Sequence, residues 1–237
     1  MKYLYLLLHV FTIAYPLAQS FESRLQYAKK WKALFPAIII TATFFIIWDV
    51  FFTQAGIWGF NREYLSGLFI VNLPIEEWLF FLTVPFASVF IYECVWYFLP
   101  KVDNPKWIFP AQFILGIILL IVALLHSEQT YTFYNFLFTG IFLLIVSYTK
   151  PLWLAKFWIG YFIHLIPFLL INGVLTGAIT PEPVVWYDNL EIMGPRIITI
   201  PIEDSMYALL LLLMNIFLYE SFIKKFDLLR TTREKSS

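Results

Sequence analysis

Residues 72–81, NLPIEEWLFF, decide the fold because they place a proline and two adjacent glutamates at the start of a long apolar segment. Near the other end of the chain, residues 199–208 read TIPIEDSMYA and repeat the arrangement. A carboxylate is costly at the boundary of an apolar medium. Two such pairs therefore need an explanation; they are Glu76 with Glu77, and Glu203 with Asp204.

The composition is that of a polytopic membrane protein. Of the 237 residues, 61% are hydrophobic and 14% are charged, whereas soluble domains carry about 25% charged residues. The mean hydropathy is +0.77. The net charge is zero, which gives no electrostatic reason to expect a nucleic-acid partner. The single cysteine, Cys94, excludes an internal disulfide and a cysteine-based metal cluster.

Seven apolar runs predict seven transmembrane helices. They cover residues 3–18, 33–52, 76–98, 107–125, 131–148, 153–175 and 203–223. The first run could instead be a signal peptide, because Lys2 precedes it and the small-residue sequence PLAQS ends it. The basic loop that follows and the repeat described below both favour a retained helix.

Basic residues predict the orientation of the seven spans. Thirteen of the 16 Lys and Arg residues fall in alternate connections and at the C-terminal end from Lys224 onward, which includes the basic tail 226–237, while Lys2, Arg62 and Arg196 fall on the other side. Since the basic side is normally cytoplasmic, we expect the N-terminus outside and the tail inside. Both acidic pairs then lie at the outer side of the membrane.

The chain is an internal repeat with a shift of 127 residues. The shift superimposes PIEE (from Pro74) on PIED (from Pro201), Gly67 on Gly194, and Tyr92-Glu93 on Tyr219-Glu220. Upstream, WDVFFTQAG (with Asp49) resembles INGVLTGAI (with Asn172), and GIWGFN resembles VVWYDN. The latter match pairs Trp58 with Trp186 and Asn61 with Asn189.

We therefore predict an all-α membrane protein built as two parallel three-helix repeats joined by a linker helix. The repeats occupy residues 1–100 and 129–225, and the linker occupies 101–128. An odd linker gives both copies the same orientation. The acidic pairs would then meet in one cleft between the halves.

Each acidic pair has a structural and a catalytic interpretation. Acids after a proline are a common helix start, because the carboxylates meet the positive end of the helix dipole. Capping alone would accept Ser, Thr or Asn equally well, yet both copies keep two acids. Burial and a like-charged neighbour favour the protonated form, which makes a carboxyl group a general acid. The catalytic candidates are Glu76, Glu77, Glu203 and Asp204.

Further polar and aromatic residues are candidates for substrate binding, although Trp58 and Trp186 would also fit an interfacial belt. The candidates are Asp49, Asn172, Trp58, Asn61, Trp186, Asn189, Pro74 and Pro201. For Glu93 and Glu220 we expect a structural role, such as pairing with loop lysines. His164 is expected to be satisfied by a backbone carbonyl, and the scattered histidines predict no metal site.

These motifs resemble the membrane-integral lycopene cyclase family. That family contains the bacterial heterodimeric carotenoid cyclases and the cyclase half of fungal fusions with phytoene synthase. The resemblance rests on PIEEWLFF, PIEDSMYA, WDVFFTQAGIWGFN and the duplicated three-helix unit, and it covers roughly residues 1–225. The second half departs from the first at Asn172, where the first has Asp49, so the halves need not do chemistry equally.

The resemblance implies a non-redox cyclisation of lycopene. An acid protonates the terminal double bond, a neighbouring double bond closes the ring, and a base removes a proton. The partners would be a lipophilic polyene substrate in the bilayer and membrane lipids, and the protein could associate with other enzymes of the carotenoid pathway. We expect no cofactor, since no Gly-x-Gly-x-x-Gly sequence indicates a flavin or nicotinamide fold; a loosely bound redox cofactor stays open.

Other functions fit the sequence less well. A small-solute transporter with 3+1+3 parallel repeats is the main alternative, but it would place polar groups near the midplane of the bilayer. A retinal protein needs a lysine inside the last helix, and the first one there is Lys224. A prenyltransferase needs aspartate-rich sites for Mg²⁺ and diphosphate. A non-catalytic subunit also stays open.

Overall fold

The computed structural model describes residues 2–234, with side chains described as far as Phe226. Its helices lie at the seven predicted apolar runs. They are α1 (Leu4–Gln19), α2 (Trp31–Ala55), α3 (Ile75–Phe98), α4 (Ile108–Leu125), α5 (Thr130–Thr149), α6 (Leu154–Leu175) and α7 (Glu203–Glu234). Six of them are long and apolar enough to cross a membrane, whereas α1 is a shorter apolar helix of 16 residues.

The end of the last helix differs from the prediction. The expected span stopped at residue 223 and the tail began at 226, but α7 continues as a helix to Glu234. The basic residues Lys224 and Lys225 therefore extend the helix instead of ending it. The rest of the predicted tail, residues 235–237, lies outside the described residues.

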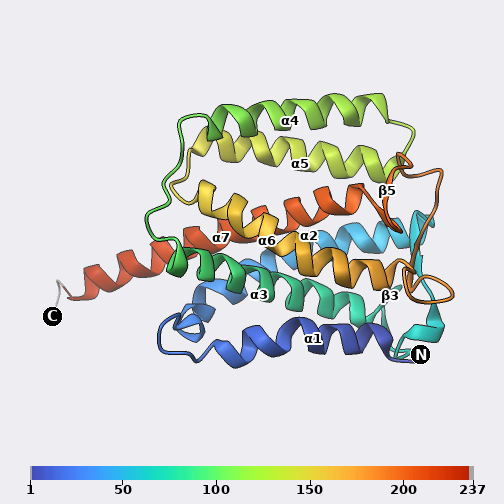
Figure 1. Cartoon of the computed structure of the whole chain (residues 1–237), viewed down its shortest axis with the longest axis horizontal. Coiled ribbons are helices and arrows are strands. Elements are labelled where there is room, and N and C mark those ends of the chain that lie inside the picture. Colours follow the sequence, from blue (N-terminus) through green and yellow to red (C-terminus); the bar gives the residue numbers. More distant parts are fainter. Residues whose placement is uncertain (1, 235–237) are drawn as a thin grey trace.

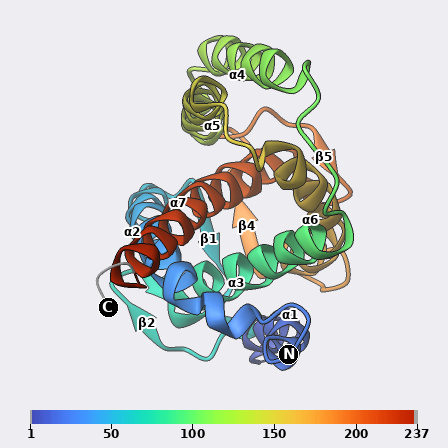
Figure 2. The same ribbon diagram turned by 90° about the vertical axis from the view of Figure 1, so that its left-hand side faces the viewer.

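The helices run side by side, and α3 and α7 occupy the centre (Figures 1 and 2). Helix α3 packs against α1, α2 and α6, while α7 packs against α5, α2 and α6. The contacts α1–α3 and α5–α7 are equivalent under the repeat, and so are α2–α7 and α6–α3. Helix α4 lies against α5 at one side of the bundle. The first two helices of each repeat thus pack around the two central helices, α3 and α7.

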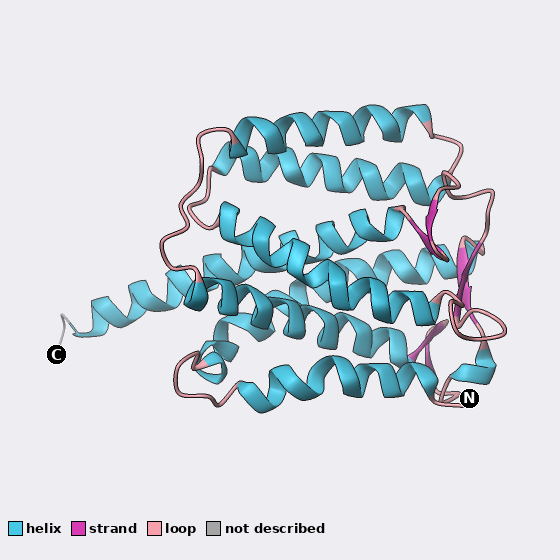
Figure 3. Ribbon diagram, viewed as in Figure 1, coloured by secondary structure: helices cyan, strands magenta, loops and turns pink. Residues whose placement is uncertain are grey.

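All six short strands gather at one end of the bundle, here called the strand end (Figure 3). The strands β2 (Phe69–Ile70) and β3 (Leu73–Pro74) form a hairpin before α3, and β5 (Arg196–Ile197) and β6 (Ile200–Pro201) form its copy before α7. Val71 and its equivalent Ile198 both have a positive φ, of 59° and 61°. A β-branched residue rarely adopts this conformation, so its recurrence marks a true structural repeat.

The third sheet joins the two halves. Strand β1 (Trp58–Phe60) pairs antiparallel with β4 (Val185–Tyr187), with Trp58 opposite Tyr187. The flanking bonds are reciprocal, since Asn61 N–H donates to Val184 (2.8 Å) and Asp188 N–H donates to Ile57 (2.9 Å). Asp188 is therefore the equivalent of Asn61. The sequence match of Asn61 with Asn189, and of Trp58 with Trp186, was wrong by one residue.

A second reciprocal contact closes the opposite end of the bundle. The Tyr92 hydroxyl donates to Glu220 (2.5 Å), and the Tyr219 hydroxyl donates to Glu93 (2.6 Å). Lys30 forms an ion pair with Glu93, as expected for a loop lysine. Because each repeat supplies one tyrosine and one acid to the other, this clasp ties α3 to α7 far from their acidic N-termini.

The clasp predicts a loss of stability in Tyr219→Phe. Tyr219 is fully buried and Glu93 is 5% exposed, so removing the hydroxyl leaves Glu93 Oε1 without its donor, while Lys30 still pairs with the other oxygen. A hydrogen bond to a charged group contributes about 1.5–3 kcal/mol, and the free energy of unfolding should fall by that order. Thermal unfolding in detergent would measure it, with Tyr148→Phe (89% exposed) as the control. Equal stability of the two variants would contradict the clasp.

Candidate active site

The acidic pairs start the two central helices at the strand end. Pro74 is the N-cap of α3, with φ −64°, and Pro201 ends β6 two residues before α7 begins. Proline suits this position because its fixed φ is compatible with a helix start. Successive helical residues point about 100° apart. The two acids of each pair therefore face different surroundings.

The first acid of each pair holds the hairpin that precedes its helix. The backbone N–H of Ser66 donates to Glu76 Oε1, and that of Met193 donates to Glu203 Oε1, both at 2.6 Å. Glu203 also accepts the Thr132 hydroxyl (2.6 Å). Neither Glu76 nor Glu203 lines the two cavities described below. Their contacts position the strand end.

The second acids, Glu77 and Asp204, line a small cavity of about 50 Å³ at the strand end. Asp49 from α2 and Asn172 from α6 line it too. The structure therefore brings four of the six predicted polar groups together, one from each of α2, α3, α6 and α7. All four side chains are buried.

Glu77 and Asp49 place two carboxyl groups in this one cavity. The Tyr5 hydroxyl donates to Glu77 Oε2 (2.8 Å), and the Tyr207 hydroxyl donates to Asp49 Oδ1 (2.9 Å). Two buried carboxyl groups beside each other repel when both are ionised, which favours one proton held by the pair.

Asp204 has a different environment, because three neutral donors surround it. The Tyr131 hydroxyl (2.7 Å), the Asn172 amide (2.7 Å) and the Tyr187 hydroxyl (2.9 Å) all donate to its carboxylate. Burial, followed by the nearby Asp204 carboxylate, raises the pKa of Tyr187 well above its usual value, so this hydroxyl keeps its proton. Hydrogen bonds to a charge contribute about 1.5–3 kcal/mol each. Three of them offset a burial cost of several kcal/mol for one ion.

Aromatic rings cover this cavity. Trp58, from β1, packs edge to face on Tyr131 and Phe52, with ring centroids 5.0 and 4.9 Å apart. The strand pairing of β1 with β4 lies over the starts of α3 and α7. Trp58 is 5% exposed. The sheet that joins the halves therefore also shields the carboxyl groups from the water beyond the strand end.

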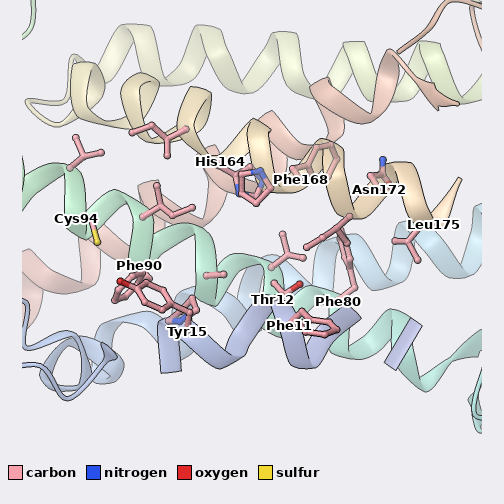
Figure 4. Close-up of a pocket in the computed structure, with 18 of the residues that line it drawn as sticks. Phe11, Thr12, Tyr15, Phe80, Phe90, Cys94, His164, Phe168, Asn172 and Leu175 are labelled. Atoms are coloured by element: carbon pink, nitrogen blue, oxygen red, sulfur yellow. The ribbon is translucent and has the colours of Figure 1, made fainter. Parts of the chain in front are cut away.

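A second, larger cavity of about 480 Å³ runs between α1, α3 and α6 (Figure 4). Its walls are almost wholly apolar and extend along α3 from Phe80 to Phe98, with Leu99 just beyond the helix. Phe11 and Tyr15 on α1 are more than half exposed although they line it. The cavity therefore opens between α1 and α6 to the outer surface of the helix bundle.

The two cavities share part of their walls. Four side chains line both, namely Phe80, Phe168, Asn172 and Leu175. The Asn172 amide lies at one end of the larger cavity and also bonds Asp204 (Figure 4). The acidic cavity thus adjoins one end of an apolar groove, and a hydrocarbon lying in the groove would have that end close to the carboxyl groups.

His164 lies on the wall of the groove, and its environment differs from the expectation. Its Nδ1 is 2.9 Å from the Ser88 hydroxyl, and its Nε2 has no partner among the described residues. The predicted backbone carbonyl is therefore replaced by a serine. Ser88 in turn donates to Val84 O, so the hydroxyl accepts from the Nδ1–H of a neutral imidazole.

The other predicted binding residues lie away from the cavities. Asn61 bonds Glu182 and caps a short 3₁₀ helix (Arg62–Tyr64), Asn189 accepts from Arg196, and Trp186 is 41% exposed. Pro74 and Pro201 are buried in their hairpins. Of the eight predicted binding residues, Asp49, Asn172 and Trp58 line the acidic cavity.

The sequence reasoning missed the tyrosines that surround the carboxyl groups. Four tyrosines donate to them, namely Tyr5, Tyr131, Tyr187 and Tyr207. Tyr5 and Tyr131 occupy the same place in the two repeats at a shift of 126 residues, which is visible in the sequence. The residues Tyr187 and Tyr207 have phenylalanine at the matching positions of the first repeat, Phe60 and Phe80. No duplication could reveal them.

The hairpin contacts predict unequal effects of two substitutions at Glu203. Glu203→Leu removes the acceptor of the Thr132 hydroxyl and the Met193 N–H, and each buried unsatisfied donor costs about 1–3 kcal/mol. Glu203→Gln keeps an acceptor oxygen and should unfold at a higher temperature than Glu203→Leu. Thermal unfolding in detergent would compare them, and equal midpoints would show that these contacts do not matter.

Comparison with known families agrees with the geometry. A family model described as lycopene cyclase matches residues 2–95 and again residues 128–222, which are the two repeats. No curated protein and no solved structure matches the chain. The match supports lycopene cyclase activity in general, and with six long apolar helices it indicates a multi-pass membrane enzyme of carotenoid biosynthesis. The chain belongs to the lycopene cyclase family and carries both halves on one polypeptide.

Proposed function

We propose that this protein is a lycopene cyclase that forms terminal rings of the β-ionone type by acid-initiated, non-redox cyclisation. The observation that carries the proposal is the group of buried carboxyls beside one end of an apolar groove. A membrane enzyme for a polar solute would need a polar path to its carboxyls. Here the path is lined by rings and aliphatic side chains.

The groove suits a long, thin hydrocarbon. It follows α3 for 19 residues, from Phe80 to Phe98, which is about 27 Å at 1.5 Å per residue. That length is close to the hydrocarbon thickness of a bilayer, about 30 Å. A polyene entering between α1 and α6 would keep its body in the groove and place one end beside the carboxyl groups.

The chemistry follows from a carboxyl group that holds a proton in a dry site. Protonation of the terminal double bond leaves a tertiary cation, the neighbouring double bond attacks it, and a six-membered ring closes. Loss of a proton from the ring then ends the reaction. No electrons are gained or lost, so the step needs no redox cofactor. Water must stay out, since it would capture the cation.

The aromatic cover of the acidic cavity supports this mechanism. Trp58, Tyr131 and Tyr207 present ring faces and edges around the carboxyls, with Trp58 and Tyr207 centroids 6.3 Å apart. A desolvated cation–π contact contributes about 2 kcal/mol or more. Rings can stabilise the cation without forming a bond to it.

We further propose that all seven helices span the membrane as two parallel repeats around the linker helix α4, with the strand end outside. Basic residues cluster at the opposite end, in the connections near Lys30, Lys101 and Lys150. The positive-inside rule places that end in the cytoplasm. Other enzymes of the carotenoid pathway would then supply the polyene from the bilayer.

Substitution of the second acids should abolish cyclisation. We expect the activity of Glu77→Gln and of Asp204→Asn to fall by about 10²–10⁴-fold, which is typical of a missing general acid or base. Glu76→Gln and Glu203→Gln should keep most of it, because Gln retains the acceptor for the hairpin N–H. The measurement is pigment chromatography in a bacterium that accumulates lycopene.

This comparison is decisive only when each variant is present in the membrane at the level of the unsubstituted protein. Formation of cyclic carotene by that protein, lost in Glu77→Gln and Asp204→Asn, supports the proposal. Unchanged lycopene with the unsubstituted protein, or full activity of both variants, would reject it.

A bulky side chain in the groove should also block the reaction. Ala87 lines the groove on α3, so Ala87→Trp would place an indole ring where the polyene should lie. We expect conversion to fall about tenfold or more, with folding judged by thermal unfolding. Ile118→Trp on the lipid-facing side of α4 is the matched control (Ile118 is 48% exposed). Equal conversion by both variants would show that the polyene binds elsewhere.

A further inference from the structure

We propose that the two repeats have divided the chemistry, so that the Asp49–Glu77 pair is the general acid and Asp204 is the general base. This inference rests on the proposed cyclase function and assigns its two proton-transfer roles. It follows from the different hydrogen-bond partners of two carboxyl groups that occupy equivalent places in the repeat.

The Asp49–Glu77 pair has the partners of a proton donor. Each carboxyl accepts one tyrosine hydroxyl, from Tyr207 and Tyr5 respectively, and both carboxyls line the same cavity. Among the described residues, no Lys or Arg side chain lines this cavity. Two buried carboxyls with no cation beside them repel each other when both are ionised, so we assign one proton to the pair. That proton is available to a double bond at the end of the groove beside this cavity.

Asp204 has the partners of a proton acceptor. Three hydrogen bonds from Tyr131, Asn172 and Tyr187 point at its two oxygens. All three come from neutral groups that favour the carboxylate over the acid. Its helix neighbour Glu203 is turned toward the Met193 N–H and the Thr132 hydroxyl and does not contact Asp204 in these bonds.

Two differences between the repeats produce this asymmetry. Glu77 faces Asp49, whereas Asp204 faces Asn172, so an amide donor replaces a second acid. Phe60 in β1 corresponds to Tyr187 in β4, which adds another donor to Asp204. Both changes supply hydrogen-bond donors to the second copy. Together they replace a pair of carboxyl groups by one carboxylate that is surrounded by protein hydrogen-bond donors.

The groove is asymmetric in the same sense. The space between α1 and α6 forms the apolar groove. Its equivalent between α5 and α2 is crossed by aromatic packing, with Phe138 of α5 5.6 Å from Phe44 and 5.2 Å from Trp48 between ring centroids. A polyene that reaches the carboxyls through the groove thus meets one acid and one base, not two equivalent sites.

The proton count balances over one cyclisation. The Asp49–Glu77 pair gives its proton to the terminal carbon of the double bond, and the ring closes on the resulting cation. Asp204 then takes a proton from a ring carbon, restoring a neutral hydrocarbon. The pair has lost one proton and Asp204 has gained one, so transfer between these groups resets the site.

Infrared spectroscopy of the purified protein tests the assignment without any substrate. A protonated carboxyl group gives a carbonyl stretching band that shifts in D₂O. We expect this band to lose one component in Asp49→Asn and in Glu77→Gln, because Asn at position 49 would donate to Glu77 as Asn172 donates to Asp204. Asp204→Asn should keep the component, and Asn172→Asp should add one. A misfolded variant could lose a band component, but the component gained in Asn172→Asp cannot be explained by misfolding in this way.

Pigment analysis of the same membranes separates this inference from the proposed function. Unsubstituted protein that makes no cyclic carotene refutes the cyclase function, whatever the spectra show. With cyclisation present, the expected band pattern together with a loss of activity of at least about 10²-fold in Asp49→Asn supports the assignment. A band retained in Asp49→Asn, or lost in Asp204→Asn, overturns it.

Discussion

The structure depends on the constraint that a carboxyl group in an apolar bundle must either share a proton or be surrounded by donors. An isolated buried ion costs several kcal/mol even after relaxation, which is a large part of the total stability of a domain. The chain meets this constraint in three ways. Glu76 and Glu203 accept backbone N–H groups, Asp49 and Glu77 share one cavity and accept one tyrosine hydroxyl each, and Asp204 accepts three donors. Each solution commits a segment of the strand end to a fixed place.

The repeat supplies the geometry for these solutions. Helices α3 and α7 are tied at one end by the strands that lead into them and by the β1–β4 sheet, and at the other end by the Tyr92–Glu220 and Tyr219–Glu93 clasp. Both ties are reciprocal between the halves. Two fixed ends hold the central helices in register, so the second acid of each pair faces the same cavity. A site made from four helices can therefore be rigid without any covalent link.

Much of this arrangement could be predicted from the sequence. Apolar runs located the seven helices, and the 127-residue shift located the acidic starts of α3 and α7, because duplicated polar residues stand out in an apolar chain. The same shift matched Tyr92-Glu93 with Tyr219-Glu220, but the reciprocal bonds between them and the short hairpins were not predicted. Sequence reasoning failed where partners depend on packing. It could not tell that Glu76 turns toward Ser66 while Glu77 turns inward, or that Trp186 stays outside. It also missed Tyr187 and Tyr207, which have no duplicated counterpart, and the groove, whose lining residues look like any lipid-facing helix surface.

Duplication explains why acid and base can be neighbours in a site with so little room. Two identical copies would place two identical proton-sharing groups on the substrate, and a cation formed by one would have no ionised partner to release its proton. One amide in place of an acid, at Asn172, and one hydroxyl in place of a hydrogen, at Tyr187, are enough to make the copies differ in proton affinity. The differences at Asn172 and Tyr187 affect the surroundings of Asp204 and not those of Glu77 and Asp49. Divergence at the partners, with the carboxyl groups themselves retained, is the smallest change that turns a symmetric pair of acids into a site with a direction of proton flow.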